Sequence, residues 1–233
     1  MSKVAIQGAA TGTGVFTLAS PATNTDRTLT LPDNSGTVLT SAGSLPAGNL
    51  TGSVPASAMP AGSVIQVVSA YHTNHNQYAS SDYQATGTQV SITPKRSDSK
   101  FLIRASMYGG VENHDVSVGF SFYDSLISTS SPIVVDNQSG GSPTNGGSGH
   151  RMGAFFGISS WGADSLPDDW FIGTAVGEYL YTPSYQNVTT RTFGVLVKTS
   201  FGYWFRENMG QRNTSDPRDV RVASQITVME IAP

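Results

Sequence analysis

The chain has no cysteine and few charged residues, and each of these shortages excludes a class of protein. Without cysteine there is neither a disulfide nor a thiolate metal site. Only 12% of the 233 residues are charged, against about 25% in ordinary globular domains. The net charge is −3, and no run of like charge occurs. A nucleic-acid-binding surface normally needs a basic stripe, so we expect no nucleic-acid partner.

Long apolar runs are missing as well. No stretch approaches the ~20 consecutive apolar residues of a membrane helix. The first residues, MSKVAIQGAATGTG, include a lysine but no apolar core of signal-peptide length. We therefore expect no membrane insertion and no export by a signal of the chain's own.

Hydroxyl side chains, glycine and proline take the place of charge. The sequence contains 55 serines and threonines, 25 glycines and 12 prolines. Such residues are poor helix formers, and together with β-branched neighbours they suit strands and turns. No amphipathic helix stands out, so the composition predicts an all-β protein.

A proline-containing repeat occupies residues 45–62. Its two nine-residue units, LPAGNLTGS and VPASAMPAG, align without a gap, and each contributes two apolar side chains. Proline excludes a helix interior, so the repeat must run extended, and an extended segment with so little apolar surface cannot bury itself. Identical chains that wrap together would bury these side chains on a shared axis. The repeat therefore predicts a fibrous homo-oligomer with Leu45, Leu50, Val54 and Met59 on its axis.

The repeat separates two parts of different composition. Residues 1–62 hold one of the 22 aromatic residues, Phe16, and four of the 29 charged ones, too little for an independent core. We expect short strands there that are ordered by oligomerisation, with disorder as the alternative. The predicted division is an N-terminal attachment and shaft segment (1–44), the repeat as linker or shaft (45–62), and a C-terminal domain (63–233).

The C-terminal domain is long enough for a core of its own, and apolar residues recur in it with a period of two. The clearest alternation is in 101–107, 118–122, 195–197 and 226–229. The further strand candidates are 64–71, 89–93, 152–159, 171–180 and 203–205. About eight short strands separated by Gly, Pro, Asn and Asp predict a β-sandwich that is jelly-roll-like.

Several motifs resemble the tail-fibre proteins of tailed bacteriophages. NTDRTLTLPDNSGTVLT (24–40) resembles their N-terminal segments, and the repeat at 45–62 resembles their shafts. MPAGSVIQVVSA (59–70), SITP (91–94) and ITVMEIAP (226–233) resemble their C-terminal tip domains. The resemblance covers both ends and the hinge of the chain but little of its middle. It implies a homotrimeric, β-rich fibre whose tip meets the bacterial surface.

The resemblance also implies location and partners. The expected protein is a virion fibre, assembled in the host cytoplasm and attached to other virion proteins through its N-terminal segment. Its C-terminal tip would bind a host surface glycan or outer-membrane protein. A head or neck fibre is the alternative within the class. A polysaccharide-degrading fibre enzyme and a non-phage lectin are the alternatives outside it.

Neither catalysis nor metal binding is predicted. The sequence lacks the motifs of serine hydrolases, P-loop proteins and zinc proteases. The candidate carboxylates for polysaccharide cleavage are Asp164, Asp168, Asp169 and Glu178, which lie near aromatic residues. Tandem aspartates after a proline are more typical of a solvated turn. The close pair His72 and His75 is interpreted as a polar loop between strands in preference to a metal site. We therefore expect a non-enzyme without a cofactor.

Aromatic residues in turn-rich sequence are the best candidates for receptor contacts. An aromatic ring flanked by amides and carboxylates suits the C–H face of a sugar, and it equally suits a protein interface. Long polar loops at 136–150 and 206–221 add candidate side chains, because binding sites favour loops held on a rigid sheet. Burial of the two tryptophans in the core is the alternative. The predicted receptor-binding residues are Trp161, Trp170, Tyr185, Arg206, Asn208 and Arg212.

Overall fold

The computed structural model divides the chain into two compact units, Met1–Gly52 and Ser53–Pro233. The second unit begins ten residues before the boundary expected at residue 63, so half of the repeat belongs to it. The residues that the structure describes are 11–15, 17, 22–26, 28, 54–111, 116–134, 154–159, 172–184, 187–210 and 219–233.

The described residues of the second unit form strands and two single 3₁₀ turns. The turns are η2 (Ala56–Ala58) and η3 (Ser200–Gly202). The strands are β1 (Val64–His72), β2 (Asn76–Tyr78), β3 (Gln84–Ile92), β4 (Lys100–Val111), β5 (Ser117–Asp124), β6 (Phe156–Ser159), β7 (Gly173–Tyr181), β8 (Arg191–Thr199), β9 (Phe205–Glu207) and β10 (Ser224–Ile231). Within the described part of the chain, no helix is long and apolar enough to cross a membrane.

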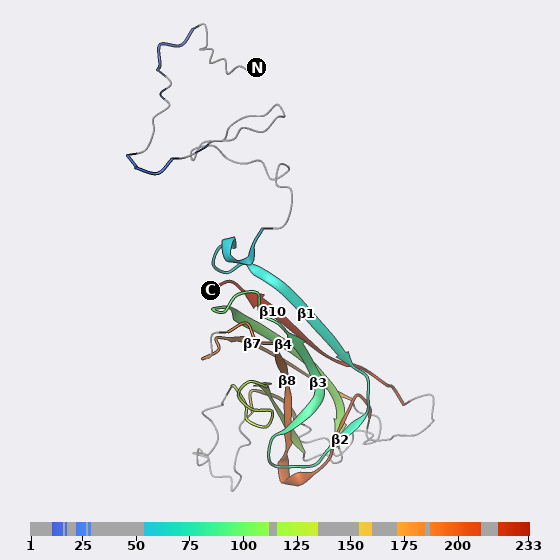
Figure 1. The fold of residues 1–233 in the computed structure, drawn as a ribbon. Coiled ribbons are helices and arrows are strands. Elements are labelled where there is room, and N and C mark those ends of the chain that lie inside the picture. The colour runs from blue at the N-terminus through green and yellow to red at the C-terminus, as the bar shows by residue number, and fades with distance from the viewer. Residues whose placement is uncertain are drawn as a thin grey trace, which may run out of the picture. The chain divides into compact units, whose positions relative to one another are not determined.

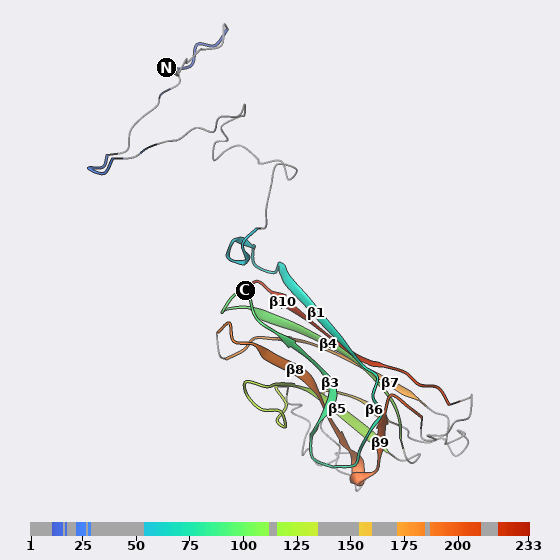
Figure 2. The same cartoon turned by 45° about the vertical axis from the view of Figure 1, so that its right-hand side comes forward.

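All strand pairs are antiparallel, and they form two sheets (Figures 1 and 2). Sheet A has the order β1-β10-β4, with β7 on the other side of β4. The short strands β9 and β2 continue sheet A beyond β10 and β1, because β9 pairs with the last residues of β4 and β2 pairs with β9. Sheet B has the order β3-β8-β5-β6.

The eight longer strands follow the order of a jelly roll. Along the chain they alternate between the sheets except at β5 and β6, which are neighbours in sheet B. The resulting sheets, β1-β10-β4-β7 and β3-β8-β5-β6, are the two four-stranded layers of that architecture. The predicted all-β fold with antiparallel sheets is therefore confirmed.

One core lies between the two sheets. Alternate residues of each strand point into it, because successive side chains of a strand face opposite sides of its sheet. Burial of each of the larger apolar side chains contributes about 1.5–3 kcal/mol. The core includes Phe101, Ile103, Ala105 and Met107 from β4, Val118, Phe120 and Phe122 from β5, Phe193, Val195 and Val197 from β8, and Ile226 and Val228 from β10.

The register of sheet A defines two ends of this domain. Val64 pairs with Ile231, which pairs with Lys100, and we call this the entry end because the chain enters β1 there. The opposite end carries β2 and β9, and we call it the distal end. Figure 2 shows β9 and the start of β1 at opposite ends of the layers.

The second repeat unit is attached to the entry end. The Arg96 guanidinium lies 3.5 Å from the carbonyl oxygens of Ala56 and Met59. The Gly62 amide donates to the Ala232 carbonyl at 2.9 Å. Of the predicted axis residues, Val54 is exposed and Met59 is half-buried, whereas Leu45 and Leu50 lie outside the described residues.

A buried carboxylate also holds this end together. Glu230 on β10 is fully buried and accepts hydrogen bonds from the Lys95 amide, the Arg96 amide and the Ser99 hydroxyl, at 2.8, 3.1 and 2.5 Å. These donors lie on the turn between β3 and β4. Since a buried charge is tolerated only when it is well hydrogen-bonded, Glu230 fixes that turn against β10.

Candidate functional site

The residues in and just before β9 form an aromatic and cationic surface at the distal end, where Tyr203 and Trp204 are exposed and Arg206 is half-buried. Trp204 and Arg206 alternate with the buried Phe205, so their side chains share the outward face of the strand. The Arg206 guanidinium lies 5.6 Å from the centre of the Trp204 ring, which is the geometry of a cation–π contact. Trp204 is 39% exposed, and the neighbouring Tyr203 is exposed to a similar degree.

The inner face of β9 anchors this surface to the core. Phe205 is fully buried, and its ring meets Phe120 edge-on at 5.3 Å and stacks on Tyr78 at 6.4 Å. Gly109 lies directly beside β9, where a Cβ atom would collide with the Arg206 carbonyl and the Phe205 ring. The backbone of Arg206 is therefore held by tight packing and not only by strand pairing.

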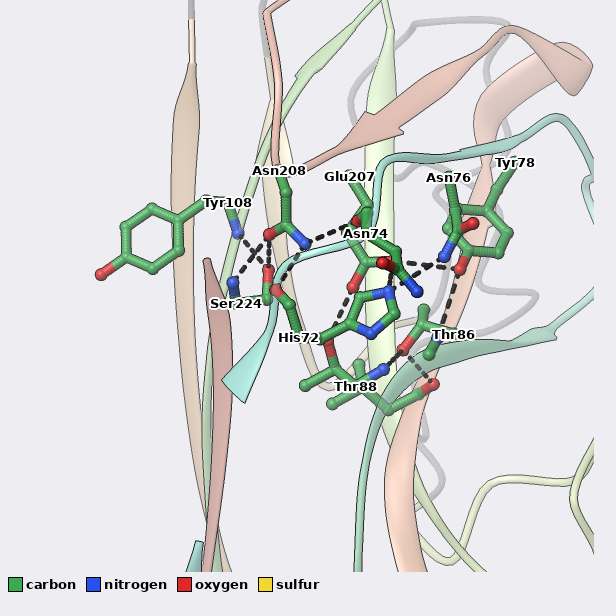
Figure 3. A network of polar contacts seen from close by, with 12 residues as sticks. His72, Asn74, Asn76, Tyr78, Thr86, Thr88, Tyr108, Glu207, Asn208 and Ser224 are labelled. Atoms are coloured by element: carbon green, nitrogen blue, oxygen red, sulfur yellow. Dashed lines mark hydrogen bonds and ion pairs between the residues drawn. The ribbon is translucent and has the colours of Figure 1, made fainter. Parts of the chain in front are cut away.

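Beneath β9 a network of polar side chains spans the gap between the two sheets (Figure 3). Glu207 is fully buried at its centre. The Thr88 hydroxyl donates to Glu207 Oε1 at 2.6 Å, and the Tyr78 hydroxyl donates to Oε2 at 3.0 Å. His72 Nε2 lies 3.5 Å from the same carboxylate and 3.0 Å from Asn76 Nδ2. The carboxylate thus joins strands of sheet A to β3 of sheet B.

Burial first, and then the Glu207 charge, raises the pKa of the Tyr78 hydroxyl above its ordinary value. The phenol therefore stays protonated and continues to donate to Glu207 at neutral pH. Because Glu207 and Thr88 are fully buried, this network is shielded from a large substrate. Its role is to position β9, and it is not an exposed acid–base pair.

Asn208 corrects one of the predicted receptor contacts. The residue is fully buried and adopts a positive φ of 64°. Its Nδ2 donates to the carbonyls of His72 and Asn74 at 2.7 and 2.9 Å, and its Oδ1 accepts from the Ser224 amide at 2.7 Å. The prediction that Asn208 contacts a receptor is therefore wrong, because its amide closes the gap between β1, β2 and β10.

Of the other five predicted receptor-binding residues, the structure describes one. Arg206 lies on the distal surface, as described above. Four residues, Trp161, Trp170, Tyr185 and Arg212, lie outside the described residues and stay predictions.

Trp204 is the residue that the sequence analysis did not select. The spacing of Trp204 and Arg206 on either side of an apolar residue was the available signal, since strand alternation places such a pair on one face.

No cluster of metal-ligating side chains occurs within the described part of the chain. His72 points into the Glu207 network, whereas His75 is exposed on the connection to β2. Nowhere in the described ranges do three His, Asp or Glu side chains lie close enough to hold a metal ion together.

With this geometry in place, we compared the chain with known proteins. No protein-family model matches the sequence, and no curated protein is detectably similar to it.

Proposed function

We propose that this protein is a bacteriophage fibre, most simply a homotrimeric tail fibre, whose distal end binds a receptor on the host bacterial surface. The observation that carries the proposal is the contact between the exposed Trp204, just before β9, and the half-buried Arg206 on β9, at the opposite end of the domain from the point of chain entry. A fibre needs this polarity, because its N-terminal segment faces the virion and its other end faces the cell.

The chemistry of the pair suits a charged glycan of the host surface. The indole ring offers a flat apolar face for the C–H face of a sugar. The guanidinium carries several donors in a rigid plane, which match carboxylate and phosphate groups in two-point contacts. The rigid support from Phe205, Glu207 and Asn208 lowers the ordering cost of binding. An outer-membrane protein is the other receptor class considered.

Binding is favoured over polysaccharide cleavage by the state of the carboxylates. Glycosidases need two carboxyl groups that flank an open site. Glu207 and Glu230 are fully buried and engaged in internal hydrogen bonds. Glu178 is exposed on β7, and its cross-strand partner in β4 is Arg104. The remaining candidates Asp164, Asp168 and Asp169 lie outside the described residues.

Adsorption of the labelled protein to a panel of bacterial strains tests the proposal. On a strain that binds the wild type, Trp204→Ala and Arg206→Ala should each weaken binding by roughly 1–3 kcal/mol per site, the scale of one aromatic contact. Multivalency in the trimer enlarges that loss.

Val188→Ala is the matched control, because Val188 is an exposed apolar residue between β7 and β8 at the entry end. Equal binding by all three folded variants would contradict a distal receptor site. Release of reducing sugars from surface polysaccharide would contradict the non-enzymatic function.

A further inference from the structure

The outer face of sheet A carries a row of four apolar side chains. Val67 on β1 pairs with Met229 on β10, Met229 with Leu102 on β4, and Leu102 with Leu180 on β7. Paired residues in a sheet project to the same side. Val67 and Leu180 at the two edges are 54% and 52% exposed, and the two central side chains are half-buried by their neighbours.

A second row lies four residues farther along each strand in the distal direction, beyond a polar row. It runs from Tyr71, which is 69% exposed, through Gln225 and Ser106 to the exposed Val176. The strands contain five exposed large apolar residues among the described positions: Val64, Val67, Tyr71, Val176 and Leu180. Four of them belong to these two rows, so the apolar surface of the sandwich is concentrated on one face.

The outer face of sheet B has the opposite character. Its exposed side chains among the described residues are small or polar, such as Ser91 on β3, which shares a 2.8 Å hydrogen bond with Thr192 on β8. Its larger residues, Leu196 and Tyr123, are buried. The exposed apolar surface of sheet A is therefore not a general property of this domain. Contiguous apolar patches of this kind mark interaction sites.

We propose that the outer face of sheet A packs against second copies of this chain, so that the three sandwiches of the fibre tip meet through their β1-β10-β4-β7 sheets. This inference rests on the proposed trimeric fibre and names the surface that completes it.

Continuity with the repeat supports a second copy as the partner. β1 begins directly after the second repeat unit, which carries the predicted axis residues Val54 and Met59 and is bound to the domain through Arg96. Chains that share an axis in the repeat must enter their tips side by side. The first outward-facing residues of β1, Val64 and Val67, are exposed and apolar, so they continue the apolar side of the repeat into the domain.

The charges between the two rows do not oppose a copy of the same face. Arg104 on β4 and Glu178 on β7 are cross-strand partners of opposite sign, and no ion pair between them occurs in the described part of the chain. In a threefold arrangement, the β1-β10 half of one face meets the β4-β7 half of the next. Ser69 and Thr227 of one copy then lie opposite Arg104 and Glu178 of another, and no like charges meet.

A small contact between the tips suffices for assembly, because in the proposed fibre the repeat already joins the chains. Tethered copies meet at a high effective concentration, so the contact avoids most of the entropy cost of association. The tip interface therefore needs less area than the roughly 800 Å² per partner of a free protein pair.

Single cysteines test this surface directly, because the natural chain has none. Thr227→Cys places a thiol at the centre of the proposed interface, on a half-buried outward position of β10. Ser91→Cys is the matched control on the exposed outer face of sheet B. With a short bis-maleimide and the full-length protein, Thr227→Cys should give covalent dimers on a denaturing gel, and Ser91→Cys should give monomers.

A charge variant supplies the second measurement. Full-length Val67→Asp/Leu180→Asp should lose its tip contacts and cross-link poorly through Thr227→Cys, whereas Ser91→Asp should behave as the wild type. A wild-type mass of three chains without cross-linking at Thr227→Cys would overturn this inference alone and leave the fibre proposal intact. A monomeric wild type would overturn both. The charge variant could also cross-link like the wild type and keep its mass, but no longer bind bacteria. That result would assign the outer face of sheet A to the receptor and would also overturn the inference.

Discussion

Replacement of Asn208 by alanine tests the physical basis of the distal surface. The substitution removes the partners of the His72 carbonyl and of the Ser224 amide, which lie in a largely buried environment, and of the Asn74 carbonyl, which water can reach. Two buried groups without partners cost about 2–5 kcal/mol in total. Alanine at a φ of 64° adds about 1–2 kcal/mol of backbone strain. The expected loss of unfolding free energy is therefore about 3–7 kcal/mol.

The matched variant Asn208→Gly separates the two contributions. Glycine loses the same hydrogen bonds but tolerates a positive φ, so it should be destabilised less than alanine. Urea unfolding followed by circular dichroism at one fixed protein concentration gives both values, since oligomer stability depends on concentration. A loss below about 0.5 kcal/mol for Asn208→Ala, the level of an ordinary surface substitution, would refute the role assigned to this residue. An alanine variant more stable than the glycine variant would refute the strain argument.

Three further substitutions have defined outcomes. Arg191→Met should lower the free energy of unfolding by about 3–5 kcal/mol, because it leaves the buried Asp124 carboxylate without its 2.9 Å ion-pair partner. Adding Asp124→Asn should recover part of this loss, as measured by urea unfolding. A double variant whose loss equals the sum of the two single losses would contradict this. Gly109→Ala should lower the free energy of unfolding by about 1–3 kcal/mol, because the added methyl group collides with the Arg206 backbone. It should also weaken binding to bacteria. An unchanged melting temperature would contradict this packing. Burial, with a smaller contribution from the Asp124 charge, raises the pKa of Tyr181 from 10.0 to about 12. The unfolded chain therefore loses this proton first, so the contribution of Tyr181 to stability should be constant below pH 10 and fall between pH 10 and 12. A Tyr181→Phe variant whose stability falls equally steeply over that range would contradict this assignment.

The strands with strict alternation were predictable from the sequence. Phe101, Ile103 and Met107 point into the core as the period of two required, and β1 and β10 lie where their patterns placed them. The boundaries of β3 and β9 were less accurate: β3 begins five residues before the predicted start at 89, and β9 occupies 205–207 instead of 203–205. Polar residues occupy the start of β3 and the end of β9, so the apolar pattern that marks a strand is weak there.

The buried polar groups were not predictable in the same way. Glu207 and Asn208 stand in a polar, charged stretch that has the composition of a loop, yet both are fully buried. Their partners Thr88 and His72 lie 119 and 136 positions away in the sequence, and no local pattern announces such a contact. The pair of Trp204 and Arg206 had one local signal, its spacing around Phe205, but its place at the distal end follows only from the pairing of β9 with β4.

The central claim is that this chain forms a virion fibre whose distal end meets the host. Electron microscopy of purified virions with an antibody raised against the β9 surface, residues 203–207, tests it most directly. Our account predicts antibody at the free ends of fibres, and predicts that the corresponding Fab fragments block adsorption to host cells. Virions that carry no antibody, or antibody bound at the virion-proximal base of a fibre, would contradict it.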